Sequence, residues 1–260
     1  MEKKDKEIKE KLLVFKKTLP SKWQEYLLII FNVIRYPSNI RKNMQTLKDG
    51  IKKSPPLVKK SKKALYRYCL RQTNPKKVKM YIETYRNQNV KCIQRNISSN
   101  LQYNEPIVIC AVKNDLHRVK MQIAHHKAMG ITNFVYIDNM SDDGTYEWLL
   151  NEGVDLYRVS DKYHSAVRSA WIRQITDIYG YNRWYLILDS DELFVYPGME
   201  KKQCKDLIAF AKKKDMSFFQ SFMIDMYSKE KINIVPPKEF DINKYNIKEN
   251  NAYFDTDTYF

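Results

Sequence analysis

A run of large apolar residues in the second half of the chain ends in closely spaced carboxylates. The run Trp184-Tyr185-Leu186-Ile187-Leu188 is followed by Asp189, Ser190, Asp191 and Glu192. Such a run is typical of a buried parallel strand, and ligands of open α/β sheets gather at the carboxyl ends of these strands. Two carboxylates with one residue between them can hold a hard divalent cation beside a phosphate. The alternative is an ordinary exposed transition from strand to loop, so the surrounding elements must decide.

The pattern around this motif alternates between strands and helices. Continuous apolar runs are typical of strands in a parallel sheet, and apolar residues at helical spacing between them are typical of crossover helices. This alternation predicts an α/β fold with a mostly parallel sheet flanked by helices. The expected strands span residues 107–112, 134–137, 155–159 and 184–188, and the expected helices span 117–130, a short segment around Trp148, and 167–180.

Polar residues also follow the first two expected strands. Lys113 and Asn114 come after the first strand, and Asp138 and Asn139 come at the end of the second. Lys113 stands at the carboxyl end of its strand, where the charge of a bound diphosphate would lie. These residues are therefore candidates for contact with a ligand held at the same sheet edge as Asp189.

The composition indicates a chain with a real hydrophobic core. Of its 260 residues 43% are hydrophobic, which is enough for one large domain or two small ones. The four cysteines show no paired metal-type spacing, which favours reduced thiols in a cytosolic setting. Residues 1–11 are charged and lack the apolar core of a signal peptide, and the longest apolar stretch, 26–34, is too short to span a bilayer.

The formal net charge of +16 is concentrated in the first hundred residues. Residues 1–100 hold 26 Lys and Arg against 7 Asp and Glu, a charge of +19, whereas residues 101–260 hold 20 against 23, a charge of −3. This shift predicts a basic, mainly helical extension over residues 1–104 and a second domain over residues 105–260.

The basic extension is expected to consist of helices broken by prolines. Trp23, Leu27, Ile30, Phe31 and Ile34 share one helical face, and tyrosines are interleaved with lysine and arginine further along. Three interpretations stay open: attachment to an anionic membrane surface, binding of a nucleic-acid backbone, and a solvated extension that packs its tyrosines on the next domain. No zinc spacing, RNP-like motif or Gly-rich nucleic-acid loop favours the second, so nucleic acid is not expected as a partner.

Three short blocks occur in order along the second domain. They are Val112 to Asp115, Ile137 to Thr145, and Leu188 to Phe194. Their order and spacing resemble the family 2-like glycosyltransferases of GT-A fold, and the third block is similar to the Asp-x-Asp metal motif of that family. The resemblance covers about residues 105–230 and implies a GT-A-like catalytic domain. Asn139 stands where the family frequently has a second Asp.

The resemblance implies a site for a nucleotide-sugar donor, with a UDP-sugar as the expected class. Asp189 and Asp191 would hold Mn²⁺ or Mg²⁺, which suit an all-oxygen site, and the metal would stabilise the diphosphate leaving group. The implied donor-binding residues are Ala111, Val112, Lys113, Asn114, Asp138, Asn139, Asp189 and Ser190.

A catalytic base that deprotonates the acceptor hydroxyl is expected downstream of the metal motif, as in the inverting members of the family. Asp255 and Asp257 are the candidates, with Asp225 as a weaker one. Residues 216–227 are expected to form another strand of the sheet. Because the chain ends in an aromatic, strand-like stretch, the acceptor part is expected to be incomplete.

Some residues near these blocks have a structural interpretation. Ser141 or Asp142 is expected to cap the helix that carries Trp148, and Asp143 to serve in the loop or as a cap. His126 is interpreted as a packing or hydrogen-bonding residue. His164 could approach the nucleotide.

Together these observations predict a metal-dependent glycosyltransferase that acts on a glycan or a lipid-linked acceptor, in surface polysaccharide or lipopolysaccharide synthesis. The basic extension would hold it at the inner face of the cytoplasmic membrane as a peripheral protein. The alternative is a non-catalytic, membrane-associated interaction protein that retains a nucleotide-binding half-domain.

Overall fold

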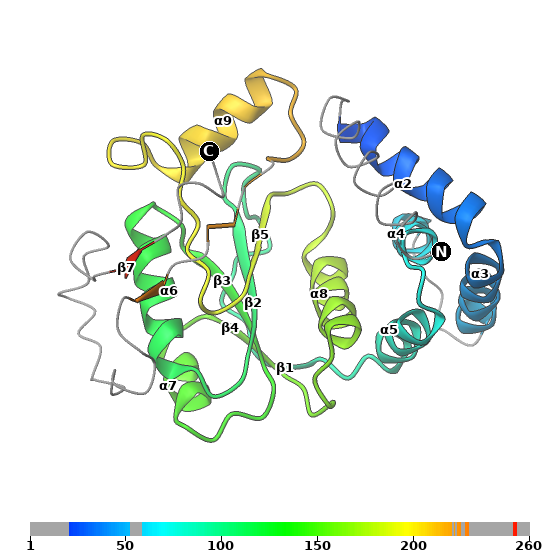
Figure 1. Cartoon of the computed structure of the whole chain (residues 1–260). Helices are drawn as coiled ribbons and strands as arrows, with labels where there is room; N and C mark the ends of the chain where they lie inside the picture. Colours follow the sequence, from blue (N-terminus) through cyan, green and yellow to red (C-terminus); the bar gives the residue numbers. More distant parts are fainter. Residues whose placement is uncertain are drawn as a thin grey trace. The chain divides into compact units, whose positions relative to one another are not determined.

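The computed structural model describes residues 21–52, 59–219, 221, 223–224, 227–228 and 252–253. In these residues the fold is α/β, with eight helices and a five-stranded, mostly parallel sheet, so the predicted fold class is confirmed. The chain divides into two compact units (Figure 1). Residues 1–89 join residues 161–179 in the first unit, and the remaining segments, 90–160 and 180–260, form the second.

The first unit is helical, as the proline-broken pattern of the basic extension predicts. Pro37 and Pro75 each stand at the start of a helix, where a missing backbone N–H costs nothing. Asn74 caps the second of these helices by accepting hydrogen bonds from the N–H groups of Lys76 and Lys77. The helices are α2 (Ser21–Arg35), α3 (Pro37–Lys52), α4 (Lys59–Arg71), α5 (Pro75–Asn87) and α8 (Ser165–Tyr179).

Tyrosines of the basic region form part of the core of this unit. Tyr68 and Tyr81 stack with ring centroids 3.8 Å apart, and Tyr85 lies beside them. The Tyr85 hydroxyl donates to the Asp177 carboxylate of α8. Tyr66, by contrast, is half exposed. The segment 161–179, which the expected boundary near residue 104 assigns to the second domain, therefore packs with the N-terminal helices.

The second unit is built on the five-stranded sheet. Its strand order is β1-β4-β3-β2-β5, and every neighbouring pair is parallel except β1 with β4. Parallel pairing follows from the helices that connect these strands. The strands are β1 (Lys91–Gln94), β2 (Ile107–Val112), β3 (Asn133–Asp138), β4 (Asp155–Arg158) and β5 (Tyr185–Leu188).

Alternate residues of β2 and β3 pack in one buried cluster with residues of three helices, which are labelled in Figure 1. The three helices are α6 (Leu116–Ala128), α7 (Thr145–Glu152) and α9 (Cys204–Lys213). Val108 and Cys110 of β2 belong to the same buried cluster as Val119 and Ile123 of α6, which lie one helical turn apart. The apolar residues of the strands, which recur every second residue, and those of the helices, which recur about every 3.6 residues, are thus buried in one core.

The strand before Asp189 differs from its prediction. β5 pairs with β2 and with no other strand among those described, and Ile187 is 46% exposed. The apolar run from Trp184 to Leu188 therefore forms an edge strand whose side chains are only partly buried, whereas a fully buried parallel strand has both faces of the sheet covered. The prediction of a buried strand is wrong in this respect, whereas its parallel direction is confirmed.

The predicted strand over residues 216–227 is also not present as expected. Asp215 follows α9 in the left-handed region, and the described residues from 216 to 224 form no strand. Tyr227 belongs to β6 (Tyr227–Ser228), which pairs with β7 (Ala252–Tyr253) instead of the main sheet. An apolar run without a pairing partner does not by itself form a strand.

No helix in the described part of the chain is both long and apolar enough to cross a membrane. The candidate bases Asp225, Asp255 and Asp257 lie outside the described residues.

Candidate functional site

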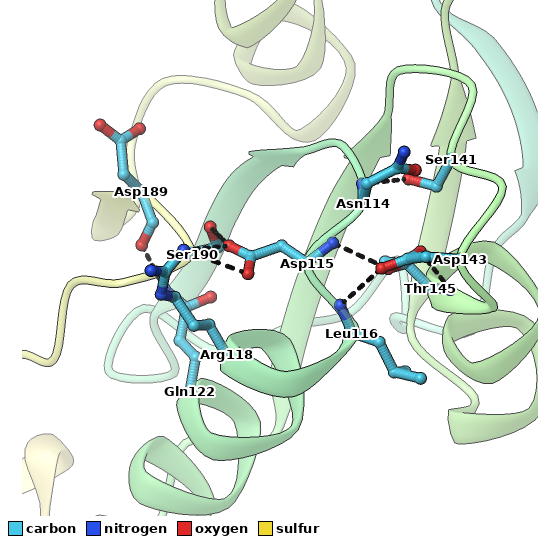
Figure 2. A network of polar contacts seen from close by, with 10 residues as sticks. All are labelled: Asn114, Asp115, Leu116, Arg118, Gln122, Ser141, Asp143, Thr145, Asp189 and Ser190. Atoms are coloured by element: carbon cyan, nitrogen blue, oxygen red, sulfur yellow. Dashed lines mark hydrogen bonds and ion pairs between the residues drawn. The ribbon is translucent and has the colours of Figure 1, made fainter. Parts of the chain in front are cut away.

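Three loops leave the carboxyl ends of neighbouring parallel strands at one edge of the sheet. Val112, the last residue of β2, pairs with Asp138, the last residue of β3, and β5 pairs with β2 on its other side. The loops that follow contain residues 113–115, 139–144 and 189–191, and Figure 2 shows polar contacts that join them. The structure therefore brings together the three sequence blocks.

Asn114 joins the first loop to the second. Its backbone is left-handed, with φ of 51°, a conformation that Asn tolerates better than most residues. Its N–H donates to Ser141 Oγ at 2.9 Å, and its side-chain amide donates to Asp142 Oδ1 at 2.6 Å. In return, Asn114 Oδ1 accepts from the Asp142 N–H at 2.9 Å. The prediction that Ser141 or Asp142 caps α7 is wrong, since the N-cap residue is Gly144 and the side chains of Ser141 and Asp142 bind Asn114.

Asp143 links the beginnings of α6 and α7. Its Oδ1 accepts from the N–H and hydroxyl of Thr145 at 2.9 and 2.5 Å, and its Oδ2 accepts from the Leu116 N–H at 3.3 Å. Burial alone would raise the pKa of the Asp143 carboxyl, but the hydrogen bonds from Thr145 and Leu116 outweigh it and lower the pKa below its usual value. Asp143 thus serves as a structural anion at two helix starts, which agrees with its predicted loop role.

Asp115 joins the first loop to the third and was not among the predicted site residues. Its carboxylate accepts a hydrogen bond from the Ser190 hydroxyl and lies 3.3 Å from Arg118 Nη1 (Figure 2). Its N–H donates to Thr145 Oγ1 at 3.0 Å. The only sequence signal for this role is its place at the end of the Val112 to Asp115 block, because its partner lies 75 residues away.

Asp138 and Asn139 are buried beneath the second loop. Both oxygens of the fully buried Asp138 carboxylate accept from the Ser141 N–H, at 3.2 and 3.3 Å, and Oδ2 lies 3.3 Å from Arg158 Nε. The Arg158 guanidinium in turn stacks over the Tyr146 ring at 4.0 Å. Asn139 donates to the Val159 carbonyl at 3.3 Å. Donor contact by Asp138 and Asn139 stays a prediction, and in this structure their side chains hold the loop.

The third loop is a tight turn held by α6. The Asp189 N–H donates to Glu192 Oε2 at 2.8 Å, and the Glu192 N–H donates to the Asp189 carbonyl at 3.0 Å. Gln122 of α6 donates to both carbonyls of this turn, Asp189 O at 2.5 Å and Glu192 O at 3.2 Å. The buried Tyr136 hydroxyl donates to Gln122 Oε1 at 2.7 Å and so orients the amide.

Two histidines of α6 hold the next segment of the same loop. His125 Nε2 lies 2.8 Å from the Phe194 carbonyl. His126 Nδ1 lies 2.7 Å from the Gln122 carbonyl, so it carries the proton, and Nε2 accepts from the Phe194 N–H at 3.3 Å. Burial, helped by neighbouring His125, lowers the pKa of His126 to about 4 against the opposing effect of the Gln122 carbonyl. The predicted packing and hydrogen-bonding role of His126 is confirmed.

The exposed charged residues at this edge include Lys113, Asp189 and Asp191, and Asn114, Met140, Asp142 and Asp143 of the first two loops are exposed as well. Figure 2 shows the Asp189 carboxylate pointing away from Asp115, while its carbonyl points toward Gln122. Turn formation therefore uses the backbone of Asp189 and leaves its carboxylate on the outer side of the loop.

The donor set fits a hard cation that also binds substrate oxygens. Among the described residues, no group of three or more His, Cys, Asp or Glu side chains could hold a metal. Mg²⁺ is often held by only one or two carboxylates together with substrate phosphates, and all-oxygen sites also suit Mn²⁺. Asp189 and Asp191 can supply these carboxylates, so the residues present fit such an ion in the presence of a phosphate ligand.

Of the remaining predicted residues, Ala111 and Val112 form the end of β2. His164 belongs to the first unit, where its Nδ1 accepts from the Ala166 N–H at the start of α8 at 3.1 Å. Its approach to a nucleotide stays a prediction.

Neither the protein-family models nor the curated proteins compared with this chain match it.

Proposed function

We propose that this protein is a metal-dependent glycosyltransferase with a GT-A-like catalytic domain. The observation that carries the proposal is the meeting of three polar loops at the carboxyl edge of a parallel sheet, with the two carboxylates of the Asp-Ser-Asp motif exposed there. In open α/β sheets this edge is where nucleotides and phosphates bind. A nucleotide-sugar, in particular a UDP-sugar, is the donor in this proposal.

Each group at the edge has a role that its chemistry suits. Asp189 and Asp191 hold Mn²⁺ or Mg²⁺, which when bound neutralises charge on the departing diphosphate. Lys113 is exposed after β2 and adds positive charge next to the same phosphates. Asn114 joins the first loop to the second through Ser141, and Ser190 joins the third loop to the first through Asp115.

The acceptor in this proposal is a glycan or a lipid-linked acceptor, as in the synthesis of surface polysaccharide or lipopolysaccharide. Its hydroxyl attacks the sugar carbon, the bond to the diphosphate breaks, and a downstream carboxylate, Asp255 or Asp257, takes the hydroxyl proton. Inversion at the sugar carbon follows from a single displacement of this kind.

The test is metal-dependent binding and turnover of nucleotide-sugars by the full chain. Thermal shift with a panel of nucleotide-sugars, with and without Mn²⁺, selects the donor, because a ligand that binds the folded state stabilises it. Release of nucleoside diphosphate is then compared between wild type and Asp191→Ala, and we expect a loss of about 100-fold or more if the metal neutralises the leaving group. Glu200→Ala is the matched control, since Glu200 is also an exposed carboxylate of the second unit.

Equal metal-dependent turnover by Asp191→Ala and wild type would contradict the metal assignment. Nucleotide-sugar binding without transfer to any acceptor would favour the non-catalytic alternative. Loss of activity in Glu200→Ala to the same degree would show that the effect is not specific to the motif.

A further inference from the structure

Helix α2 turns its apolar side chains away from the core of the helical unit. Ile34 is 75% exposed, Ile30 51% and Val33 42%. Val33 and Ile34 lie three and four positions after Ile30, so both share a face of the helix with it. In an ordinary surface helix the apolar face is the one that is buried, so an apolar face that points away from its own unit is a candidate interaction surface.

The opposite side of α2 is held by a polar contact. Asn32 is only 3% exposed, and its amide donates to the carbonyls of Leu70 and Arg71 at the end of α4, at 3.3 and 3.0 Å. Asn39 and Asn43 of α3 bind neighbouring carbonyls in the same way. The side-chain amides of α2 and α3 thus bind the carbonyl groups at the end of α4 and hold the two helices against it. The apolar face of α2 takes no part in these contacts.

The exposed apolar face belongs to a strongly basic unit. The described residues of the first unit hold 19 Lys and Arg against 5 Asp and Glu. Exposed cations of α2 and α3 include Arg35, Arg41 and Lys42. A helix with an apolar face and basic surroundings has the two features that hold an interfacial helix on an anionic bilayer.

We propose that α2 docks this protein on an anionic lipid bilayer, with Ile30, Val33 and Ile34 in the boundary between head groups and acyl chains. The cations of the unit lie against the lipid phosphates. A nucleic acid would satisfy the cations but offers no apolar phase for the isoleucines. A second copy of the chain would bring two basic surfaces together, which like-charge repulsion opposes.

The test is binding of the full chain to vesicles, without nucleotide-sugar, so that its outcome is independent of glycosyltransferase activity. Vesicles of phosphatidylcholine alone are compared with vesicles of equal parts phosphatidylcholine and phosphatidylglycerol. We expect binding to the anionic vesicles only, and weaker binding at higher ionic strength. The double variant Ile30→Ser/Ile34→Ser should bind at least about tenfold more weakly, because it loses two apolar side chains from the boundary.

The matched control is Leu150→Ser/Phe210→Ser, which removes two similarly exposed apolar residues from α7 and α9 and should bind like wild type. Circular dichroism shows whether each variant is folded. Anionic-vesicle binding by Ile30→Ser/Ile34→Ser at wild-type strength overturns the proposal, as does failure of the wild type to bind. Concentration-dependent dimerisation that this variant abolishes, without vesicle binding, assigns the face to a second copy. Tight RNA or DNA binding without vesicle binding also overturns it.

Discussion

Asp115 and Ser190 make the contact that joins the loop after β2 to the loop after β5. Ser190 lies between Asp189 and Asp191 in sequence, so its hydrogen bond to Asp115 ties the segment that carries both carboxylates to the first loop. Asp115 also lies beside Arg118, but that pair is largely exposed on the arginine side and contributes little to stability. At this scale Asp115 is a positioning residue, since it acts through Ser190.

We expect Asp115→Ala to lower metal-dependent turnover about 10-fold or more, in the range seen when a partner of a metal-binding group is removed. Asp115→Asn retains an oxygen that accepts from the Ser190 hydroxyl and should keep most of the activity. Arg118→Ala is the control and should resemble wild type. Turnover measured with Mn²⁺ for the three variants decides the point. An equal loss in Asp115→Ala and Asp115→Asn would contradict the hydrogen-bond role.

At the scale of elements, α6 holds the acidic loop. Gln122, His125 and His126 project from this helix onto the carbonyl and N–H groups of residues 189–194. Among the described residues this loop pairs with no strand, and its backbone groups bind side chains of α6 in addition to the bond from the Glu192 N–H to the Asp189 carbonyl. A buried polar network of this kind is stabilising when every polar group in it has a hydrogen-bond partner, because an unpaired buried polar group is costly.

The low pKa of His126 makes this contact dependent on pH. The folded-state pKa is about 4, below the unfolded value near 6.5, so the unfolded chain binds more protons between these values. The contribution of neutral His126 to the free energy of unfolding is fully present above about pH 6.5. It decreases as the pH falls toward 4, by about 3 kcal/mol in total. We expect urea unfolding of the wild type to show this loss.

The variant His126→Gln, which does not titrate, should lose this slope of unfolding free energy between pH 6.5 and 4. His117→Gln should retain it, because His117 is an exposed residue of the same helix. A slope that is unchanged in His126→Gln would show that other groups cause the acid sensitivity.

At the scale of the whole molecule, the helical unit is discontinuous in sequence. Helix α8 begins 78 residues after α5 ends, yet Gln174 donates to the Thr84 carbonyl at 3.0 Å and Tyr85 binds Asp177. Residues 161–179 should therefore open together with the N-terminal helices and separately from the sheet, as one cooperative unit.

Gly50→Ala tests this cooperativity. A Cβ at Gly50 would lie 2.4 Å from Ile82 Cγ2, so the close approach of α3 and α5 must widen. Overpacking costs about 1–3 kcal/mol and outweighs the gain of about 1 kcal/mol in helix propensity. We expect hydrogen exchange to accelerate in α3, α5 and α8 while α6 is unchanged. Gln45→Ala, on the exposed side of α3, is the control. Faster exchange in α6 and in the helical unit to the same degree would contradict two separate units.

Several elements could be predicted because their determinants are local. The apolar run of β2 was placed at its observed bounds, and the helices after Asp115, Gly144 and His164 follow from apolar residues at helical spacing. Loop composition also indicated which strand ends carry polar groups. The edge position of β5, the partners of Ser141, and the burial of Asp138 could not be predicted, because each depends on residues distant in sequence.

The α/β class and the strand ends that are followed by polar residues could be predicted from the sequence, because hydrophobic periodicity and the residues after each strand are properties of short segments. Only the tertiary structure decided that Asp115 reaches Ser190, that Gln122 holds the Asp189 turn, and that α8 joins the N-terminal helices. These contacts span from 67 to 92 residues of sequence, and their geometry follows from packing of the whole chain.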